Sequence, residues 1–212
     1  MKNVLVMGAT SGIGKCTVAV GLAKGYRIRA FARGADALAP QEGLEAIAGD
    51  ALVAANVGEV LEGVDAVIYA LGIKESVAML WQTVTLFSRS TEVLLSEMNK
   101  TGVKRLIAVT GFGAGRSRQA MSKVEQIGHR ALLGRPYADK DVQEQMIIDS
   151  DTDWTIARPV ILTNNQDKVS YRVLRDPDTW RNGLVARKAV ADYLINAVDD
   201  PQDIGKDLVL LR

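Results

Sequence analysis

Three glycines near the N-terminus constrain the fold of this chain more than any other feature. Gly8, Gly12 and Gly14 follow the apolar run KNVLVM and precede KCTVAVGLAKG, in which apolar residues recur at helical spacing. A short apolar run that ends at glycine is typical of a strand covered on both faces. The stretch therefore predicts a strand, a tight turn and a helix, the unit from which parallel sheets are built.

The same alternation continues along the chain. Strands are predicted at RIRAFA, LEAIAGD, VDAVIYAL, GVKRLIAVTG, DWTIARP and DLVLL, and helices at ALVAANVGEVLEG, 77–100, 122–133, ADKDVQEQMIIDS and RKAVADYLINAVDD. A loop is predicted at 111–118, a helix end at the GRP sequence 134–136, and a pair of short strands around 169–174.

This order predicts an α/β fold that is Rossmann-like and doubly wound, with a mainly parallel sheet and helices on both faces. We expect residues 1–212 to form one nucleotide-binding domain, in which residues from about 160 to 212 make a small portion beside the substrate.

The composition excludes several classes of function. The 26 basic and 25 acidic residues give a formal net charge of +1, so bulk charge gives no reason to expect a nucleic-acid partner. Cys16 is the one cysteine and His129 the one histidine, which disfavours a disulfide framework and a His/Cys metal site. His129 is interpreted as a surface or packing residue rather than a catalyst.

No run approaches the roughly 18–20 apolar residues that span a bilayer, and the N-terminus lacks the apolar region of a signal peptide. We therefore expect a cytoplasmic protein, a monomer or small homo-oligomer, with no metal and no membrane partner.

The glycine turn is suited to a dinucleotide. Glycines adopt a positive φ and let the backbone approach a pyrophosphate, and the following helix offers free N–H groups and the positive end of its dipole. A glycine-rich turn without a ligand is the less favoured alternative. The predicted cofactor contacts here are Gly8, Thr10, Ser11, Gly12, Ile13 and Gly14.

The residue after the second predicted strand indicates which nucleotide is bound. An acid there pairs with the ribose hydroxyls of NAD, whereas an arginine accommodates the 2′-phosphate of NADP. The segment AFARGAD places Arg33 at this position, and its planar fork suits a phosphate. Asp36 is the competing interpretation, because it could meet the ribose instead. The sequence favours NADP(H) over NAD(H).

Further cofactor contacts are predicted directly after the third, fourth and sixth strands, where parallel sheets hold their ligands. They are Gly49, Asp50, Ala70, Leu71, Gly72, Pro159, Val160 and Ile161. Asp50 could meet the adenine amino group or cap the next helix. Pro159 lacks an N–H, so the two residues after it could offer backbone amides to the nicotinamide carboxamide.

The chain resembles the atypical short-chain dehydrogenase/reductases, in the branch that contains NmrA-like proteins and flavin reductases of the biliverdin reductase B type. The resemblance covers nearly the whole chain and rests on the order and spacing of MGATSGIG, FAR, GD, GVKRLIAVTGFGAG, DKDVQEQMIIDSDTDWTIARP and GLVARKAVADYLINAV. It implies a Rossmann-like fold, NADPH binding and, for the reductase members, hydride transfer to flavins or other conjugated acceptors.

The chain departs from the wider family at the proton donor. The usual Tyr-x-x-x-Lys pair is absent, since Tyr137 and Lys140 are three residues apart and Tyr137 is expected in a loop. Gly111 follows Thr110 where the reductase branch often has serine, and Val160 stands where biliverdin reductase B has histidine. The resemblance therefore identifies no side-chain acid.

Thr110 and Lys140 are the predicted catalytic residues. Thr110 ends the fifth strand, where its hydroxyl could bond the substrate or the carboxamide; the alternative is a threonine satisfied within the protein. Lys140 resembles the lysine that holds the nicotinamide ribose, and a lysine in the first turn of a helix is otherwise unfavourable. Glu144, one turn later, could pair with Lys140. Both catalytic candidates are also predicted to contact the cofactor.

Gly111, Phe112 and Arg116 are predicted to contact the acceptor, with Arg116 and Arg118 attracting an anion such as a flavin phosphate. Arg158 is interpreted as structural, pairing acids from neighbouring elements. The sequence favours an NADPH-dependent reductase of a flavin or similar conjugated small molecule. The alternative is an NADP(H)-sensing regulatory protein without turnover; a nucleotide-sugar or isoprenoid epimerase or reductase is a weaker third interpretation.

Overall fold

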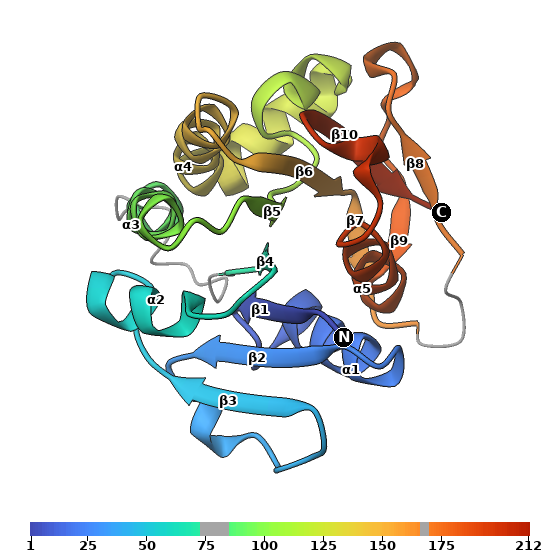
Figure 1. Ribbon diagram of the computed structural model, residues 1–212. Helices are drawn as coiled ribbons and strands as arrows, with labels where there is room; N and C mark the ends of the chain where they lie inside the picture. The colour runs from blue at the N-terminus through green and yellow to red at the C-terminus, as the bar shows by residue number, and fades with distance from the viewer. Residues whose placement is uncertain (73–84, 166–169) are drawn as a thin grey trace.

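The structure, a computed structural model, describes residues 1–72, 85–165 and 170–212. The start of the helix predicted at 77–100 lies outside the described residues. For residues 128–134, which include His129, the backbone is described but the side chains are not. Figure 1 shows a central sheet with helices on both faces. The expected α/β, Rossmann-like fold is confirmed.

The main sheet has eight strands in the order β3-β2-β1-β4-β5-β6-β10-β8. Their bounds are β1 Asn3–Met7, β2 Arg27–Ala32, β3 Leu44–Ala48, β4 Ala66–Tyr69, β5 Arg105–Val109, β6 Asp153–Pro159, β8 Arg172–Leu174 and β10 Lys206–Leu211. Neighbouring strands pair in parallel except β8, which is antiparallel to β10. The parallel strands therefore end at one common edge, called here the carboxyl edge.

Two groups of helices cover the two faces of the sheet (Figure 1). They are α1 Gly12–Ala23 and α5 Arg187–Asn196 on one face, and α2 Ala54–Leu61, α3 Leu86–Thr101 and α4 Lys123–Ile148 on the other. Strand β1 explains the division, because successive side chains of a strand point to opposite faces. Val4 and Val6 pack in the core under α1 and α5, whereas Leu5 and Met7 pack under the other three helices.

Helix α4 corrects one prediction. The GRP sequence at 134–136 was expected to end a helix, but α4 continues through it with Pro136 inside. A proline in a helix removes one N–H donor and crowds the preceding turn, a local cost that contacts elsewhere along α4 offset. As a result Tyr137 and Lys140 lie on a continuous helix, where three-residue spacing places them on the same side.

Two sets of contacts hold α4 on either side of the proline. Ser122 and Glu125 form a capping box at its start, each side chain bonding the other's backbone N–H. In its second half, the buried carboxylate of Asp139 accepts hydrogen bonds from the N–H groups of Phe87 (2.8 Å) and Ser88 (3.3 Å) at the start of α3. Tertiary bonding therefore overrides the local signal to break the helix.

The C-terminal part also differs from expectation. Of the strand pair predicted around 169–174, the described residues 170–174 contain one strand, β8, which bonds β10 instead of a sequence neighbour, and residue 169 lies outside the described residues. A separate parallel pair, β7 Ile161–Thr163 and β9 Leu184–Ala186, was not predicted. The predicted loop 111–118 contains the start of a 3₁₀ turn, η3 Gly115–Ala120.

Candidate functional site

A cavity of about 680 Å³ opens at the carboxyl edge, beside β1 to β4. It is lined by Gly8, Thr10, Ser11, Phe31, Ala32, Arg33, Gly34, Gly49, Asp50, Ala51, Leu52, Leu71, Gly72 and Leu86. The structure thus brings together predicted cofactor contacts that follow the first four strands. The remaining predicted residues lie beside this cavity or at the ends of β5 and β6.

The three glycines of the turn have different tasks. A Cβ on Gly8 would lie 2.6 Å from the carbonyl oxygen of Ala70, and one on Gly14 would collide with the carbonyl of Gly8. These two glycines are therefore required for close packing of strand and helix. Gly12 has φ +54° with nothing within 4 Å of the Cβ position. Only this glycine keeps space open at the helix start.

The start of α1 is available to an anion. Its N-cap residue, Ser11, makes no side-chain cap hydrogen bond, and the first turn contains no acid. The N–H groups at the start of a helix have no partner within the helix. Together with the hydroxyls of Thr10 and Ser11 in the cavity wall, they form a site that suits phosphate. Ile13 turns its side chain to the core instead.

Arg33 lies in the turn after β2 with its side chain exposed, and it makes no hydrogen bond or ion pair with any described residue. Asp36, the competing residue, is also exposed and unpaired among the described residues, but it does not line the cavity. A guanidinium at the rim with no internal partner remains able to bind a ligand phosphate.

Asp50 lies in the cavity wall but does not cap the following helix. Its Oδ1 accepts a hydrogen bond from the N–H of Leu52 (2.9 Å), and α2 begins after Val53. The interpretation of Asp50 as a helix cap is wrong, because the chain makes a short turn before α2. Its contact with adenine stays a prediction.

Thr110 and Lys140 meet at the end of β5. The Lys140 ammonium donates to the carbonyl oxygen of Thr110 (2.6 Å) and lies 4.6 Å from the centre of the Phe87 ring. Burial lowers the pKa of Lys140 to about 8, against the opposing effect of the charges of Glu144 and Asp139. The predicted catalytic pair is therefore in contact.

Glu144 does not form the predicted pair with Lys140. Its Oε1 accepts a hydrogen bond from the Thr110 hydroxyl (2.6 Å), and both its oxygens bind Arg158, at 3.0 Å to Nε and 2.6 Å to Nη2. The guanidinium of Arg158 reaches the carboxylate from the neighbouring strand β6, which the local i, i+4 spacing does not anticipate.

Arg158 is fully buried and also binds Asp207 through Nη1 (2.7 Å). Arg116 binds the same carboxylate from the outside, and both guanidinium groups lie over the Trp180 ring, at 5.6 Å for Arg116 and 5.1 Å for Arg158. Burial alone would raise the pKa of Asp207, but hydrogen bonds and charge from Arg116 and Arg158 hold it below its ordinary value. The structural role inferred for Arg158 fits these contacts, and the acceptor-contact prediction for Arg116 falls on a paired side chain.

Two backbone amides predicted to meet the carboxamide are bonded within the protein. The N–H of Val160 donates to Leu210 (3.1 Å), and the N–H of Ile161 donates to Gly183 (3.2 Å). Neither N–H is free for a ligand in this structure. The prediction that these two amides meet the carboxamide does not fit the structure, and a cofactor contact through other atoms of residues 159–161 stays a prediction.

Tyr137 is the site residue that sequence reasoning missed. A Cβ on Gly111 would lie 2.6 Å from the Tyr137 hydroxyl oxygen, and Lys140 Nζ lies 5.9 Å from the centre of the Tyr137 ring. Phe112, the next predicted acceptor contact, is buried and bonds Pro159 through its N–H (3.0 Å). The Tyr-x-x-Lys spacing was the available signal, but its use required knowing that α4 continues through Pro136.

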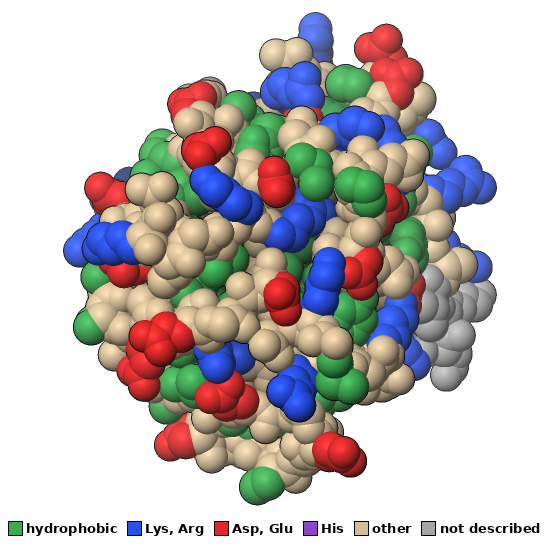
Figure 2. Space-filling view, viewed as in Figure 1, with side chains coloured by type: hydrophobic (Ala, Val, Ile, Leu, Met, Phe, Trp, Pro, Cys, Tyr) green, Lys and Arg blue, Asp and Glu red, His purple; other side chains and the backbone are tan. Residues whose placement is uncertain are grey.

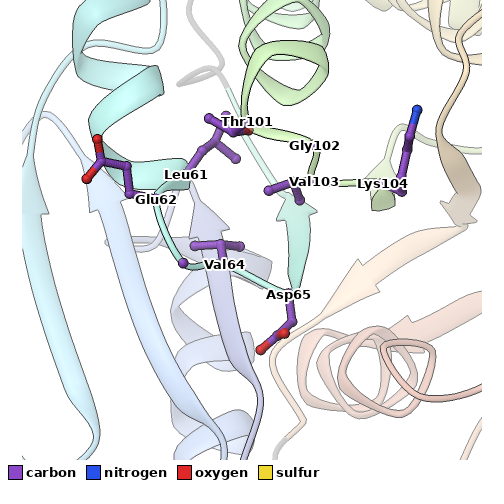
Figure 3. Close-up of a pocket in the computed structure, with 9 residues that line it drawn as sticks. Leu61, Glu62, Val64, Asp65, Thr101, Gly102, Val103 and Lys104 are labelled. Carbon is purple, nitrogen blue, oxygen red and sulfur yellow. The ribbon is translucent and has the colours of Figure 1, made fainter.

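A second cavity, of about 560 Å³, lies at the opposite edge of the sheet, where α2 and α3 end (Figure 3). It contains none of the predicted site residues. Figure 3 shows that Glu62, Asp65 and Lys104 point in different directions. Asp65 accepts from the N–H of Asn3 (2.7 Å), and Lys104 pairs with Asp151. These groups do not converge on a common centre.

The surface carries charges of both signs, interspersed over the face in Figure 2. Among the described residues, no group of three or more His, Cys, Asp or Glu side chains could hold a metal ion. Within the same residues, no helix combines the length and apolar character needed to cross a membrane.

Comparison with known proteins identifies the family of the chain and agrees with its fold. Residues 8–201 match a family described as NAD(P)H-binding. A short-chain dehydrogenase/reductase from Veillonella parvula, solved with NADP, has 17% sequence identity and a TM-score of 0.83, with 100% of this chain and 94% of that chain covered. ChuY, described as an anaerobilin reductase from Escherichia coli O157:H7, has 22% identity and a TM-score of 0.82, covering 99% and 97%. A Rossmann-fold NAD(P)-binding protein from Shigella flexneri has 23% identity and a TM-score of 0.78, covering 100% and 94%. At these identities, the solved structures establish the shared fold.

Proposed function

The chain belongs to the NAD(P)H-binding family, and from this premise we propose that it is an NADPH-dependent reductase of a flavin or another conjugated small molecule. The observation that carries the proposal is one cavity that joins the uncapped start of α1 to Arg33, which has no partner among the described residues. A dinucleotide with a 2′-phosphate has anionic groups for both places.

The residues present fit the cofactor. The first-turn N–H groups of α1, with Thr10 and Ser11, would hold the pyrophosphate, and the open space at Gly12 would admit it. Arg33 would hold the 2′-phosphate, and Lys140 would lie on the nicotinamide side. When bound, NADPH supplies the hydride.

Tyr137 is the proposed proton donor. Its hydroxyl lies beside Gly111 at the end of β5, next to the predicted nicotinamide position. The Thr110 hydroxyl gives its hydrogen to Glu144 and cannot serve as the acid. The Lys140 ammonium, near the Tyr137 ring, would favour the phenolate left after proton transfer. A carbonyl acceptor needs this proton, whereas a flavin can take one from solvent.

The acceptor class rests on the family resemblance and on the fold shared with the anaerobilin reductase. A regulatory protein that binds NADP(H) without turnover is the second candidate. It is favoured by the internal bonding of Thr110, Val160 and Ile161, which leaves few donors for an acceptor.

The deciding experiment measures NADPH and NADH oxidation by the purified protein with FMN, FAD, biliverdin, anaerobilin and quinones. We expect saturable turnover with NADPH preferred. Tight NADPH binding with no acceptor consumed would favour the regulator. Absence of binding to either nucleotide would reject both candidates.

Arg33→Ala tests the choice of cofactor. Loss of a charge-assisted phosphate contact should weaken NADPH binding by about 10- to 100-fold and leave NADH binding unchanged. Arg172→Ala is the matched control, because Arg172 is an exposed arginine on the edge strand β8, away from the cavity. Equal loss of NADPH and NADH affinity in Arg33→Ala would contradict the assignment.

A further inference from the structure

A series of buried hydrogen bonds ends at Thr110. The residue is 6% exposed, and its hydroxyl donates to Glu144 Oε1 at 2.6 Å. A carboxylate offers only lone pairs, so the hydrogen of this bond must come from Thr110. Such charge-assisted bonds are stronger than neutral ones. The hydroxyl hydrogen therefore points inward, away from any ligand.

The position of the Glu144 carboxylate is fixed by its contacts. The fully buried guanidinium of Arg158 donates to both Glu144 oxygens, and its remaining Nη1 donates to Asp207. Gly115 leaves just enough room, since a Cβ there would collide with Glu144 Oε2. The direction of the Thr110 hydrogen is thus fixed by residues from β6, β10 and the η3 turn.

The backbone groups of Thr110 are also occupied. Its carbonyl oxygen accepts from Lys140 (2.6 Å), and its N–H donates to Ala157 (3.1 Å). What Thr110 has left for a ligand is the lone pairs of its hydroxyl oxygen.

We propose that Glu144 is a positioning residue that fixes the Thr110 hydroxyl as a hydrogen-bond acceptor, so that this position selects a ligand group carrying an N–H or O–H. A carbonyl oxygen or developing oxyanion facing Thr110 would meet lone pairs and be disfavoured. The donor is either the carboxamide NH₂ of the cofactor or an N–H or O–H of the acceptor. This inference rests on the proposed function, since it concerns the ligands of that same site.

The first experiment asks whether Thr110 accepts a hydrogen bond. Thr110→Val removes the hydroxyl with little change in shape, and Thr110→Ser keeps it. Binding of NADPH is compared with binding of the analogue in which an acetyl group replaces the carboxamide, which keeps the carbonyl but has no N–H. The Michaelis constant of the acceptor is measured in parallel.

If the cofactor supplies the donor, the wild-type protein should prefer NADPH over the acetyl analogue by about tenfold, and Thr110→Val should abolish that preference. If the acceptor supplies it, Thr110→Val should raise the acceptor's Michaelis constant by a similar factor. Thr110→Ser should stay close to wild type in either case. The inference is overturned if Thr110→Val changes neither quantity.

The second experiment asks whether Glu144 acts through Thr110. Glu144→Leu, which has no oxygen to accept from the Thr110 hydroxyl, should reproduce the Thr110→Val effect, and the double variant should be no worse than Thr110→Val alone. Losses that multiply would indicate independent roles and overturn the positioning role. Asp203→Asn is the control, because Asp203 is a buried carboxylate paired with Arg175 away from the site. It should lower stability without altering ligand preference.

If Glu144→Leu does not fold, Gly115→Ala replaces it, since the added methyl displaces the Glu144 carboxylate while keeping its charge. It should reduce the preference for an N–H donor in the same way, and an unchanged preference would overturn the positioning role.

Failure of the proposed function is distinguishable from failure of this inference. If the proposed function is wrong, the wild-type protein binds no nucleotide or consumes no acceptor. If only this inference is wrong, the wild-type protein binds nucleotide and consumes an acceptor, and the variants behave as the wild type does.

Discussion

The two halves of the carboxyl edge use their charged side chains in opposite ways. Beside β1 to β4, the side chains of Arg33 and of Lys15, in the first turn of α1, make no hydrogen bond or ion pair with the described residues, and the start of α1 has no side-chain cap. Beside β5, β6 and β10, Glu144, Arg158 and Asp207 satisfy one another away from water. The first half has charged groups without partners among the described residues, whereas the second half holds its own side chains in place. Under the proposed function, the first half would bind the phosphates of the cofactor and the second would hold side chains in a fixed geometry.

The largest expected effect is on the paired half. Arg158→Leu leaves the carboxylates of Glu144 and Asp207 buried without their shared partner, so the free energy of unfolding should fall by about 3–5 kcal/mol. Urea denaturation measures this change. Arg33→Leu, in the unpaired half, should change it by no more than about 0.5 kcal/mol. Similar losses of unfolding free energy in Arg158→Leu and Arg33→Leu would contradict the distinction between a paired and an unpaired half.

The glycine turn gives the next largest effect. Gly12 and Gly25 both have positive φ with open space around the Cβ position, so alanine at either should cost about 1–2 kcal/mol of stability. Only Gly12→Ala should also weaken NADPH binding, by about tenfold or more, because Gly12 is the first residue of α1 and Gly25 follows the end of that helix. Thermal unfolding and NADPH titration of the two variants measure both quantities. Unaltered NADPH affinity in Gly12→Ala would contradict the phosphate site.

The pH dependence tests Lys140, which lies between the halves. Its pKa of about 8 means that the ammonium loses its proton as the pH rises through 8. If the charged form holds the cofactor, NADPH affinity should fall across this range, and Lys140→Arg should move the fall to higher pH. Titration of NADPH between pH 6 and 10 measures this. If NADPH affinity falls over the same pH range in the wild-type protein and in Lys140→Arg, the fall belongs to the titration of another group.

Lys140 also affects stability, with a definite sign. The ordinary lysine pKa is 10.5, so between about pH 8 and 10.5 the unfolded chain binds the extra proton. The contribution of Lys140 to stability is therefore unfavourable below pH 8 and improves as the pH rises through this window. The stability difference between wild type and Lys140→Met, from denaturation at each pH, should show this slope.

The smallest effect is expected at Arg116. Its side chain is 63% exposed, and Asp207 keeps Arg158 as a partner when Arg116 is removed. Arg116→Ala should cost less than about 1 kcal/mol of stability. Asp207 already binds the Arg116 guanidinium, so we expect Arg116 to contribute little to binding a flavin phosphate. In Arg116→Ala, the affinity for FMN should therefore fall by at most about twofold more than the affinity for riboflavin, which lacks the phosphate. A large loss specific to FMN would instead support the acceptor-phosphate contact predicted from the sequence.

Local sequence determined the elements of the first half well. The apolar run before Gly8, the helical spacing after it and the strand at 27–32 were found where predicted. Each is a short-range pattern, since alternation and turn chemistry are set by neighbours in the chain. Arg33 was placed at the cavity rim by the same reasoning, because the end of a strand fixes the position of the next residue.

Only the tertiary structure decided the second half. Helix α4 passes through Pro136 because contacts from α3 and the first-turn cap support it, and this continuity brings Tyr137 to Gly111. Strand β8 bonds β10 rather than a neighbour in sequence.

The pairing of the Glu144 side chain also could not be predicted from the local sequence. Local spacing predicted Lys140 as its partner, but it binds Arg158, 14 residues away on β6. A sequence determines periodicity and turns through interactions between near neighbours. The partner of a buried charge is decided by which strands and helices meet, and that depends on the whole fold.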